Sequence, residues 1–149
     1  MLGNLSESEC DNLLLSQCIG RIGYTNGKIP SIAPVTYIFD GKRIIGQTKE
    51  GTKLAVLRNN PDVCFEVDVI TNMDNWKTVL LYGTFTELTG TQAETAREYL
   101  FSHTLTLMTP TVIHHHEHEV ICEVNDDNRI KPIMYQIEIR EKNGRFERQ

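Results

Sequence analysis

The chain has 149 residues, of which 40% are apolar and 23% are charged, and its formal net charge is −5. This composition supports one domain (1–149) with a packed core and excludes a disordered chain. The acidic balance argues against nucleic acid as a partner, because negative surfaces repel the phosphate backbone. No apolar run approaches the roughly 20 residues of a membrane helix, and the first residues lack the basic region of a secretory signal. We therefore expect a cytoplasmic protein with no membrane partner.

The first half of the chain predicts one helix followed by strands. Ser6 and Glu9 have the spacing of a capping box, and Gly20 is a plausible end for that helix. Strands are predicted over 21–25, which is short and mixed, and over 32–39, which is rich in β-branched and aromatic residues. The segment 43–48 is predicted as the return strand of the second hairpin. Asn26-Gly27 and Asp40-Gly41 separate the strands and are typical of hairpin turns.

The second half predicts two more helices and three more strands. A short helix opens at 50–53 and ends at Pro61, which cannot continue the hydrogen-bond ladder. Strands follow over 63–70 and 76–88 around a polar loop (71–75), then a helix over 91–102 and a last strand over 133–140. A polar tail is expected from Asn143-Gly144, and 108–117 has no clear assignment. About six strands joined mainly by tight turns predict a mainly β fold, a six-stranded antiparallel barrel with two or three helices outside it.

The four cysteines are widely spaced and form no Cys-x-x-Cys pair. Neither a zinc site nor a disulfide framework is indicated, so we interpret them as buried cytosolic thiols. They are Cys10, Cys18, Cys64 and Cys122.

A candidate phosphate site lies at the start of the second predicted helix. Thr48, Thr52 and Lys53 supply two hydroxyls and one ammonium within six residues, and Gly51 allows close backbone approach. Backbone N–H groups and the helix dipole favour an anion at this position. A Thr-Lys pair at a helix start is also typical of an ordinary solvated end, and the pattern alone leaves both interpretations open.

Trp76-Lys77-Thr78 opens a long predicted strand and is a second candidate. An indole, a cation and a hydroxyl together can contact a flat polar ring and its tail. The alternative is a core tryptophan beside an exposed lysine.

The run from His114 to His118 is a third candidate. In a strand, His114, His116 and His118 would share one face, where imidazoles can bind zinc, copper or nickel. No further ligand is fixed nearby by the sequence, and such runs also occur as surface loops, so we assign no metal site. No catalytic triad or general base has a recognisable local signature.

Taken in order, the motifs resemble the pyridoxamine 5′-phosphate oxidase-like split-barrel flavoproteins, and most of all the branch that includes the nitroimidazole-resistance proteins. The resemblance runs from about Gly20 to Leu88, and the segments around Tyr135 and Asn143-Gly144-Arg145 are similar to the family's closing strand. It implies a Greek-key split barrel. The motifs that carry it are Gly20-Arg21-Ile22-Gly23, Ile29-Pro30, Ala33-Pro34-Val35-Thr36-Tyr37, Gly51-Thr52-Lys53-Leu54, Asn60-Pro61-Asp62-Val63-Cys64-Phe65-Glu66-Val67, Trp76-Lys77-Thr78-Val79 and Gly83.

The resemblance also implies a homodimer that holds flavin mononucleotide (FMN) at the subunit interface. By that analogy the flavin ring would be lined by the backbone of Pro34, Val35, Thr36 and Tyr37. Gln47 and Thr48 would contact the ring edge or the ribityl chain, and Thr52 and Lys53 would hold the phosphate. Further polar contacts would come from Lys77 and Thr78, with Trp76 beside them.

One position departs from the branch. A histidine often stands there where this chain has Gln47, and Gln cannot titrate near neutral pH. The expectation is an FMN-dependent oxidoreductase that takes electrons from a reduced nicotinamide or another donor and reduces a small electrophile, for example a nitroaromatic. FAD carries the same ring and first phosphate, so it stays possible. The alternative is a non-catalytic protein that binds or stores a flavin or a related cofactor.

Overall fold

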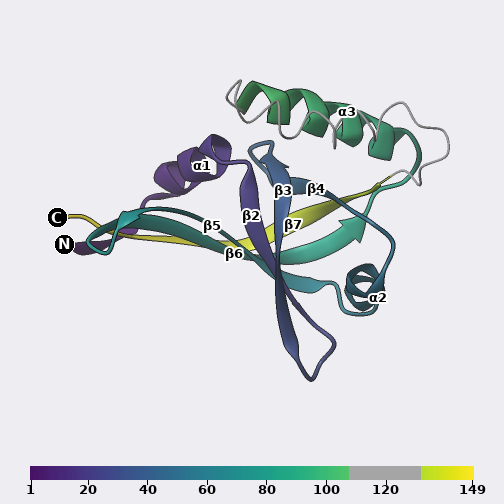
Figure 1. Ribbon diagram of the computed structural model, residues 1–149, viewed down its shortest axis with the longest axis horizontal. Helices are drawn as coiled ribbons and strands as arrows, with labels where there is room; N and C mark the ends of the chain where they lie inside the picture. The colour runs from purple at the N-terminus through teal and green to yellow at the C-terminus, as the bar shows by residue number, and fades with distance from the viewer. Residues whose placement is uncertain (108–131) are drawn as a thin grey trace.

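The computed structural model describes residues 1–107 and 132–149, and the histidine run and Cys122 lie outside this range. Figure 1 shows strands crossing in a twisted barrel with helices on its outside. The elements in chain order are β1 (Leu2–Leu5), α1 (Glu7–Ser16), β2 (Ile19–Thr25), β3 (Pro30–Phe39), β4 (Arg43–Thr48), α2 (Thr52–Asn59), β5 (Asp62–Asn72), β6 (Asn75–Glu87), α3 (Gly90–Leu107) and β7 (Ile133–Glu147).

Six of the strands close into an antiparallel barrel. Their order is β7-β4-β3-β2-β5-β6, and β6 pairs back onto β7 along its length, from Trp76 opposite Glu147 to Glu87 opposite Tyr135. The short strand β1 adds to β7 at one end. The predicted mainly β, six-stranded antiparallel barrel is confirmed, with one extra strand that the sequence did not indicate.

The barrel interior is filled by side chains that alternate along the strands. Tyr37, Phe65 and Tyr135 are fully buried there, and the Tyr37 and Phe65 rings meet edge to face at 5.1 Å. Leu13 and Leu14 of α1 join this core, as do Leu54 and Leu57 of α2. The packed interior leaves the outside of the barrel as the place for a ligand.

α3 covers a separate part of the outer surface, above β3, β4 and β7 (Figure 1). Its buried face packs on outward-facing residues of these strands and forms a second core cluster. The members are Ile38, Ile45, Leu88, Ala93, Ala96, Leu100 and Met134. None of the helices within the described residues is long and apolar enough to cross a membrane.

The first helix begins as predicted and ends earlier. Ser6 Oγ accepts a hydrogen bond from the Glu9 backbone N–H at 3.2 Å, and the two side chains also bond at 3.1 Å. Gly20 is not the helix end: α1 stops at Ser16, and Gly20 lies in β2. A Cβ at position 20 would overlap the Phe65 ring, so this glycine serves close packing inside the barrel.

Both predicted hairpin turns are present. Asn26 Oδ1 accepts from the N–H groups of Lys28 and Ile29, and Gly27 has a φ of +94°. The β2–β3 connection is longer than a two-residue turn, since β3 begins at Pro30. Asp40 Oδ1 accepts in the same way from Lys42 and Arg43, at 2.9 Å each. Short polar side chains therefore fix both turns through backbone N–H groups.

The predicted polar tail at Asn143-Gly144 is wrong. β7 continues to Glu147 because Gly144 is paired on both edges, with Val79 of β6 and with Leu5 of β1. A Cβ at Gly144 would lie 2.5 Å from Cys10 Sγ, so the missing side chain lets α1 approach the strand. The Asn-Gly pair here serves packing and does not make a turn. The predicted loop 71–75 is likewise tighter, because β5 runs to Asn72 and β6 starts at Asn75.

Two buried tyrosines differ in their hydrogen bonding and give a matched test of the core. The Tyr37 hydroxyl donates to the Leu14 carbonyl at 2.7 Å, whereas the Tyr135 hydroxyl has no partner among the described residues. Tyr37→Phe should lower the free energy of unfolding by about 1–2 kcal/mol, because it leaves a buried carbonyl unpaired. Tyr135→Phe should leave it unchanged or raise it. Urea denaturation of the two variants measures both effects, and equal losses would contradict this assignment.

Candidate functional site

The first part of the candidate site is an open edge of β3. β3 pairs with β4 only over Tyr37–Phe39, and the last pair of this ladder is Tyr37 opposite Gly46. The Tyr37 N–H donates to Cys18 on the β2 side at 3.0 Å. Because successive N–H groups of a strand point to alternate edges, the Thr36 N–H points to the β4 side, just beyond the last pair of that ladder. A ligand can therefore form main-chain hydrogen bonds with β3 here.

The side chains of the predicted ring-binding segment divide between inside and outside. Val35 and Tyr37 are buried in the barrel, Pro34 is exposed and Thr36 is half-buried. The prediction that this segment would contribute its backbone fits this pattern, since two of the four side chains are unavailable to a ligand.

β4 leads from this edge to α2. Thr48 is buried and Gln47 half-buried at the end of β4, and Thr52 is exposed at the start of α2. Gly51 precedes the helix and supplies no side chain to cap it. The first N–H groups of α2 therefore lack an internal acceptor, which is the arrangement that binds anions at helix starts.

Lys53 is the cation of this part of the site. Its side chain is half-buried, and desolvation lowers the pKa of its ammonium group. No ion pair among the described residues involves Lys53. A partly desolvated ammonium is stabilised by a bound anion, so this position can hold an anion.

Arg58 fixes α2 to the barrel. Its Nε and Nη2 atoms donate to the two carboxylate oxygens of Glu87 at 3.0 Å each, and Nη1 donates to Glu50 at 2.8 Å. The contact lowers the pKa of Glu87. A bidentate pair of this kind holds direction as well as distance, so α2 is held at the C-terminal end of β6.

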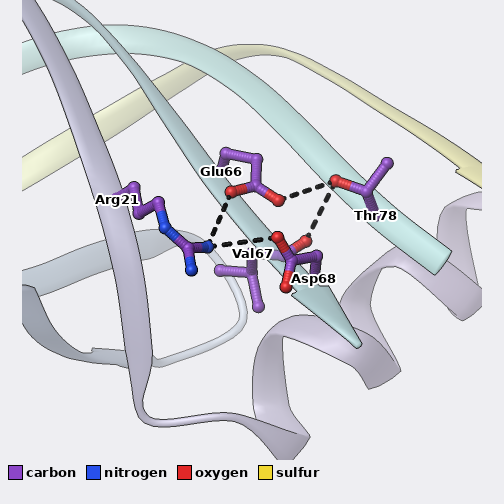
Figure 2. Close-up of polar contacts among 5 residues, drawn as sticks. All are labelled: Arg21, Glu66, Val67, Asp68 and Thr78. Atoms are coloured by element: carbon purple, nitrogen blue, oxygen red, sulfur yellow. Dashed lines mark hydrogen bonds and ion pairs between the residues drawn. The ribbon is translucent and has the colours of Figure 1, made fainter. Parts of the chain in front are cut away.

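The second part of the candidate site lies on the outer face of β2, β5 and β6. Figure 2 shows Arg21 between two carboxylates: its Nη1 atom lies 3.2 Å from Glu66 Oε2 and 3.1 Å from Asp68 Oδ2. Thr78 Oγ1 lies 3.0 Å from Glu66 Oε1 and 3.3 Å from the Val67 carbonyl. Arg21, Glu66, Asp68 and Thr78 form what we call the outer network.

Glu66 is the perturbed member of the outer network. Burial raises its pKa, and the hydrogen bond and negative charge of Asp68 raise it further. The hydrogen bonds from Thr78 and Arg21 oppose this shift and do not cancel it. The network therefore contains a carboxyl group that holds its proton more tightly than an ordinary glutamate.

Trp76 and Lys77 stand at the start of β6. Trp76 is half-buried and its Nε1 donates to Glu147 at 3.1 Å, so it is not a fully enclosed core residue. Lys77 is exposed. Because Arg58 ties α2 to Glu87, and a strand rises about 3.3 Å per residue, Trp76 lies on the order of 30 Å from that end of β6. Figure 1 accordingly shows α2 and the β5–β6 hairpin at opposite ends of the molecule.

The structure therefore divides the predicted site residues into two groups. One group follows β3, the end of β4 and the start of α2, and its β3 part reaches the outer network, since Pro34 lies opposite Arg21. Its members are Pro34, Val35, Thr36, Tyr37, Gln47, Thr48, Thr52 and Lys53. The other lies at the start of β6 and consists of Trp76, Lys77 and Thr78. Arg21, Glu66 and Asp68 were missed as site residues. The i, i+2 spacing of the two acids predicts a shared strand face, but the register of β2 against β5 is needed to place Arg21.

An apolar groove of about 590 Å³ adjoins the outer network on the same face. Cys64 and Tyr82 line it opposite each other, and Ile32, which is 69% exposed, lies across from Gly23. A larger cleft of about 810 Å³ lies between α1, the β3–β4 hairpin and β7, and no predicted site residue lines it. Two cations of this cleft already have carboxylate partners, because Lys142 pairs with Asp11 and Arg140 pairs with Asp62. These charges are therefore less available to a ligand, and we place the candidate site on the outer face of the barrel.

Of the cysteines within the described residues, only Cys10 is buried as predicted. Cys18 and Cys64 are half-buried, and all three are free thiols. The same part of the chain contains no group of three metal-ligating side chains. The histidine candidate lies outside the described residues.

A closed six-stranded antiparallel barrel with helices packed on its outside defines the class, a split-barrel protein. The comparison with protein families gives the particular family. Residues 6–139 match the model of the pyridoxamine 5′-phosphate oxidase family, and the chain belongs to it.

The individual proteins that resemble this chain share less than 30% of their residues with it. An uncharacterised protein of Rhizobium meliloti is 28% identical over 88 residues, which are 59% of this chain and 58% of that protein. An FAD-binding protein of Mesorhizobium loti has a TM-score of 0.78 at 21% identity, covering 100% of this chain and 98% of its own. A candidate 5-nitroimidazole antibiotic resistance protein of Bacteroides thetaiotaomicron has a TM-score of 0.68 at 10% identity, covering 98% and 87%. At these identities the solved structures establish the shared fold.

Proposed function

We propose that the protein is a homodimeric flavoprotein that binds FMN and reduces a small electrophile, for example a nitroaromatic. The observation that carries this proposal is Lys53, a half-buried ammonium group with no partner among the described ion pairs, beside the uncapped start of α2. Family membership and the FAD-binding name of a structural neighbour support a flavin as the ligand.

The residues at the start of α2 fit a phosphate. Lys53 supplies a positive charge, Thr52 a hydroxyl, and the first turn of the helix supplies free N–H donors. The terminal phosphate of FMN is compact and close to doubly charged. It therefore matches one cation and one helix start better than the diphosphate of FAD, which extends into a second nucleotide.

The ring would lie against the open edge of β3. Main-chain groups around Thr36 would hydrogen-bond the ring, with Gln47 beside them. The flavin supplies the redox chemistry when bound, and the protein orients the ring and excludes water from one face of it. No described side chain is needed as a nucleophile in this scheme.

We infer that two chains complete the site. In one chain Trp76 and Lys77 lie at the opposite end of the molecule from α2, on the order of 30 Å from the Arg58–Glu87 anchor. One FMN cannot bridge this separation. If both groups of residues contact one flavin, the second group comes from a partner copy, which places the ring at the interface between copies.

Replacement of Lys53 tests the phosphate contact directly. Lys53→Gln should raise the Kd for FMN about 10–100-fold, the loss expected for a charged hydrogen bond of about 1.5–3 kcal/mol. The Kd for riboflavin, which lacks the phosphate, should stay the same. Quenching of flavin fluorescence measures both constants.

Lys49→Gln is the matched control, because Lys49 is an exposed lysine four positions earlier. It should leave both Kd values unchanged. An equal loss of FMN and riboflavin binding in Lys53→Gln would show that Lys53 supports the fold and does not hold the phosphate.

Mixed dimers test whether two chains share one site. A dimer that combines one Lys53→Gln chain with one Lys77→Glu chain contains one site with both changes and one unchanged site. It should bind FMN at half of its sites with the affinity of the unmodified protein, as measured by titration of dimers purified through two different tags. If each site belonged to a single chain, neither site of the mixed dimer would keep that affinity.

Turnover separates an oxidoreductase from a flavin store. The FMN-loaded protein should oxidise a reduced nicotinamide dinucleotide only when a 5-nitroimidazole or a comparable nitroaromatic is present, with loss of the nitro absorbance. Lys53→Gln should lose this rate at low FMN and recover it when FMN is saturating. Tight FMN binding without turnover for any donor or acceptor would favour the non-catalytic alternative.

A further inference from the structure

The hydroxyl of Thr78 is oriented by its neighbours in the outer network (Figure 2). Its oxygen lies 3.0 Å from Glu66 Oε1 and 3.3 Å from the Val67 carbonyl, and both are acceptors when Glu66 is ionised. A threonine hydroxyl carries one proton, which must therefore point into the protein. Toward a ligand outside the network, the Thr78 hydroxyl can therefore only accept a hydrogen bond.

Arg21 holds Glu66 in the position that this requires. One guanidinium nitrogen bridges Glu66 Oε2 and Asp68 Oδ2, so Glu66 Oε1 stays directed at Thr78. The groups that face Glu66 are Arg21 from β2, Asp68 from β5 and Thr78 from β6, and Arg145 of β7 stands opposite Thr78. Glu66 thus has a fixed position and a defined set of charged neighbours.

We propose that Glu66 is a positioning residue of the flavin site, which fixes the Thr78 hydroxyl as an acceptor so that this position selects a ring edge that donates an N–H. The imide N–H of the flavin ring is such a donor. This inference rests on the proposed function, and it adds a residue and a rule of ligand selection to it. A ring with only acceptors at that edge would meet lone pairs and bind less well.

The proposal gives a pH dependence with a defined sign. When Glu66 is protonated it loses its charge and shares its proton with Asp68, the hydrogen bond that raises its pKa. Its Oε1 atom is then a neutral, weaker acceptor, and the Thr78 hydroxyl is held less firmly with its proton directed inward. FMN affinity should therefore fall as the pH falls through the pKa of Glu66, which burial and Asp68 raise above its ordinary value.

The test compares FMN with 3-methyl-FMN, in which a methyl group replaces the imide hydrogen. The unmodified protein should prefer FMN, and Thr78→Val and Glu66→Ala should each reduce this preference about three- to tenfold, the worth of one hydrogen bond. Glu66→Gln turns its amide oxygen to Arg21, which can only donate, and its NH2 group to Thr78. It is therefore a neutral analogue of protonated Glu66, and it should reduce the preference and lose the pH dependence. Asp62→Asn is the matched control, because Asp62 also lies on β5 and pairs with an arginine, Arg140, at 3.1 Å; it should behave like the unmodified protein.

The outcomes separate this inference from the proposed function. If the unmodified protein binds no FMN, the proposed function fails. If it binds FMN through Lys53 but Thr78→Val and Glu66→Ala leave the preference for FMN over 3-methyl-FMN unchanged, the role of Glu66 is refuted and the flavin assignment stands. A pH dependence that persists in Glu66→Gln would also overturn it.

Discussion

The structure depends on the pairing of one long strand, β7, with three others. β7 pairs with β4 over Arg43–Thr48, with β6 along most of its length, and with β1 at its end. Since β4 and β6 end the row of barrel strands on opposite sides, a strand that pairs with both closes the barrel and leaves neither edge open. The register shift beside Gly83 lets β7 bend as it passes between these partners.

Closure of the barrel also decides where a ligand can bind. A barrel of few strands has an interior that side chains fill, and Tyr37, Phe39, Phe65 and Tyr135 fill this one. The inside is thereby unavailable, and the outer face, the open edge of β3 and the start of α2 remain. α3 already covers the outside of β3 and β4 near Ile38 and Ile45. The candidate site lies on surfaces that no described helix covers.

The distribution of charged side chains also indicates a ligand site at the start of α2. The net charge is −5, and cations such as Arg21, Arg58, Arg140 and Lys142 have carboxylate partners. Lys53 is half-buried and has none among the described residues. Desolvating an ammonium group without a partner costs free energy, and an acidic chain contains many carboxylates that could have offset this cost. An anion from solution is the simplest partner for such a group.

Much of the fold follows from local sequence signals, and the exceptions have physical causes. Turn residues and β-branched runs give five of the six barrel strands to within a few residues, because hairpins are set by local chemistry. Gly20 and Asn143-Gly144 are misread because the same residues that end helices and make turns also permit close packing, and only the tertiary structure distinguishes the two uses. β1 is too short to give a periodic signal.

The site is predictable in part for the same reason. Thr52 and Lys53 are neighbours in the sequence, so their place at a helix start can be read from it. The outer network joins Arg21 to residues 45 and 47 positions away, and no local pattern encodes that register. Likewise, the family resemblance predicts that Trp76 and Lys53 both contact one flavin, whereas the barrel places the start of β6 and α2 at opposite ends of the molecule.

That separation links the closed barrel to its assembly. A flat ring on the outside of a barrel would have one face against β3 and the other in water, and an apolar ring surface left in water weakens binding. The groove next to the outer network, with Ile32 69% and Tyr82 43% exposed, leaves apolar side chains uncovered on the same side of the barrel. A second copy that covers this face would bury the groove, cover the ring and bring its own Trp76 and Lys77 to a flavin held by Lys53. The proposed division of the site between two chains has this physical reason: a barrel with a filled interior can enclose a ligand only against another surface.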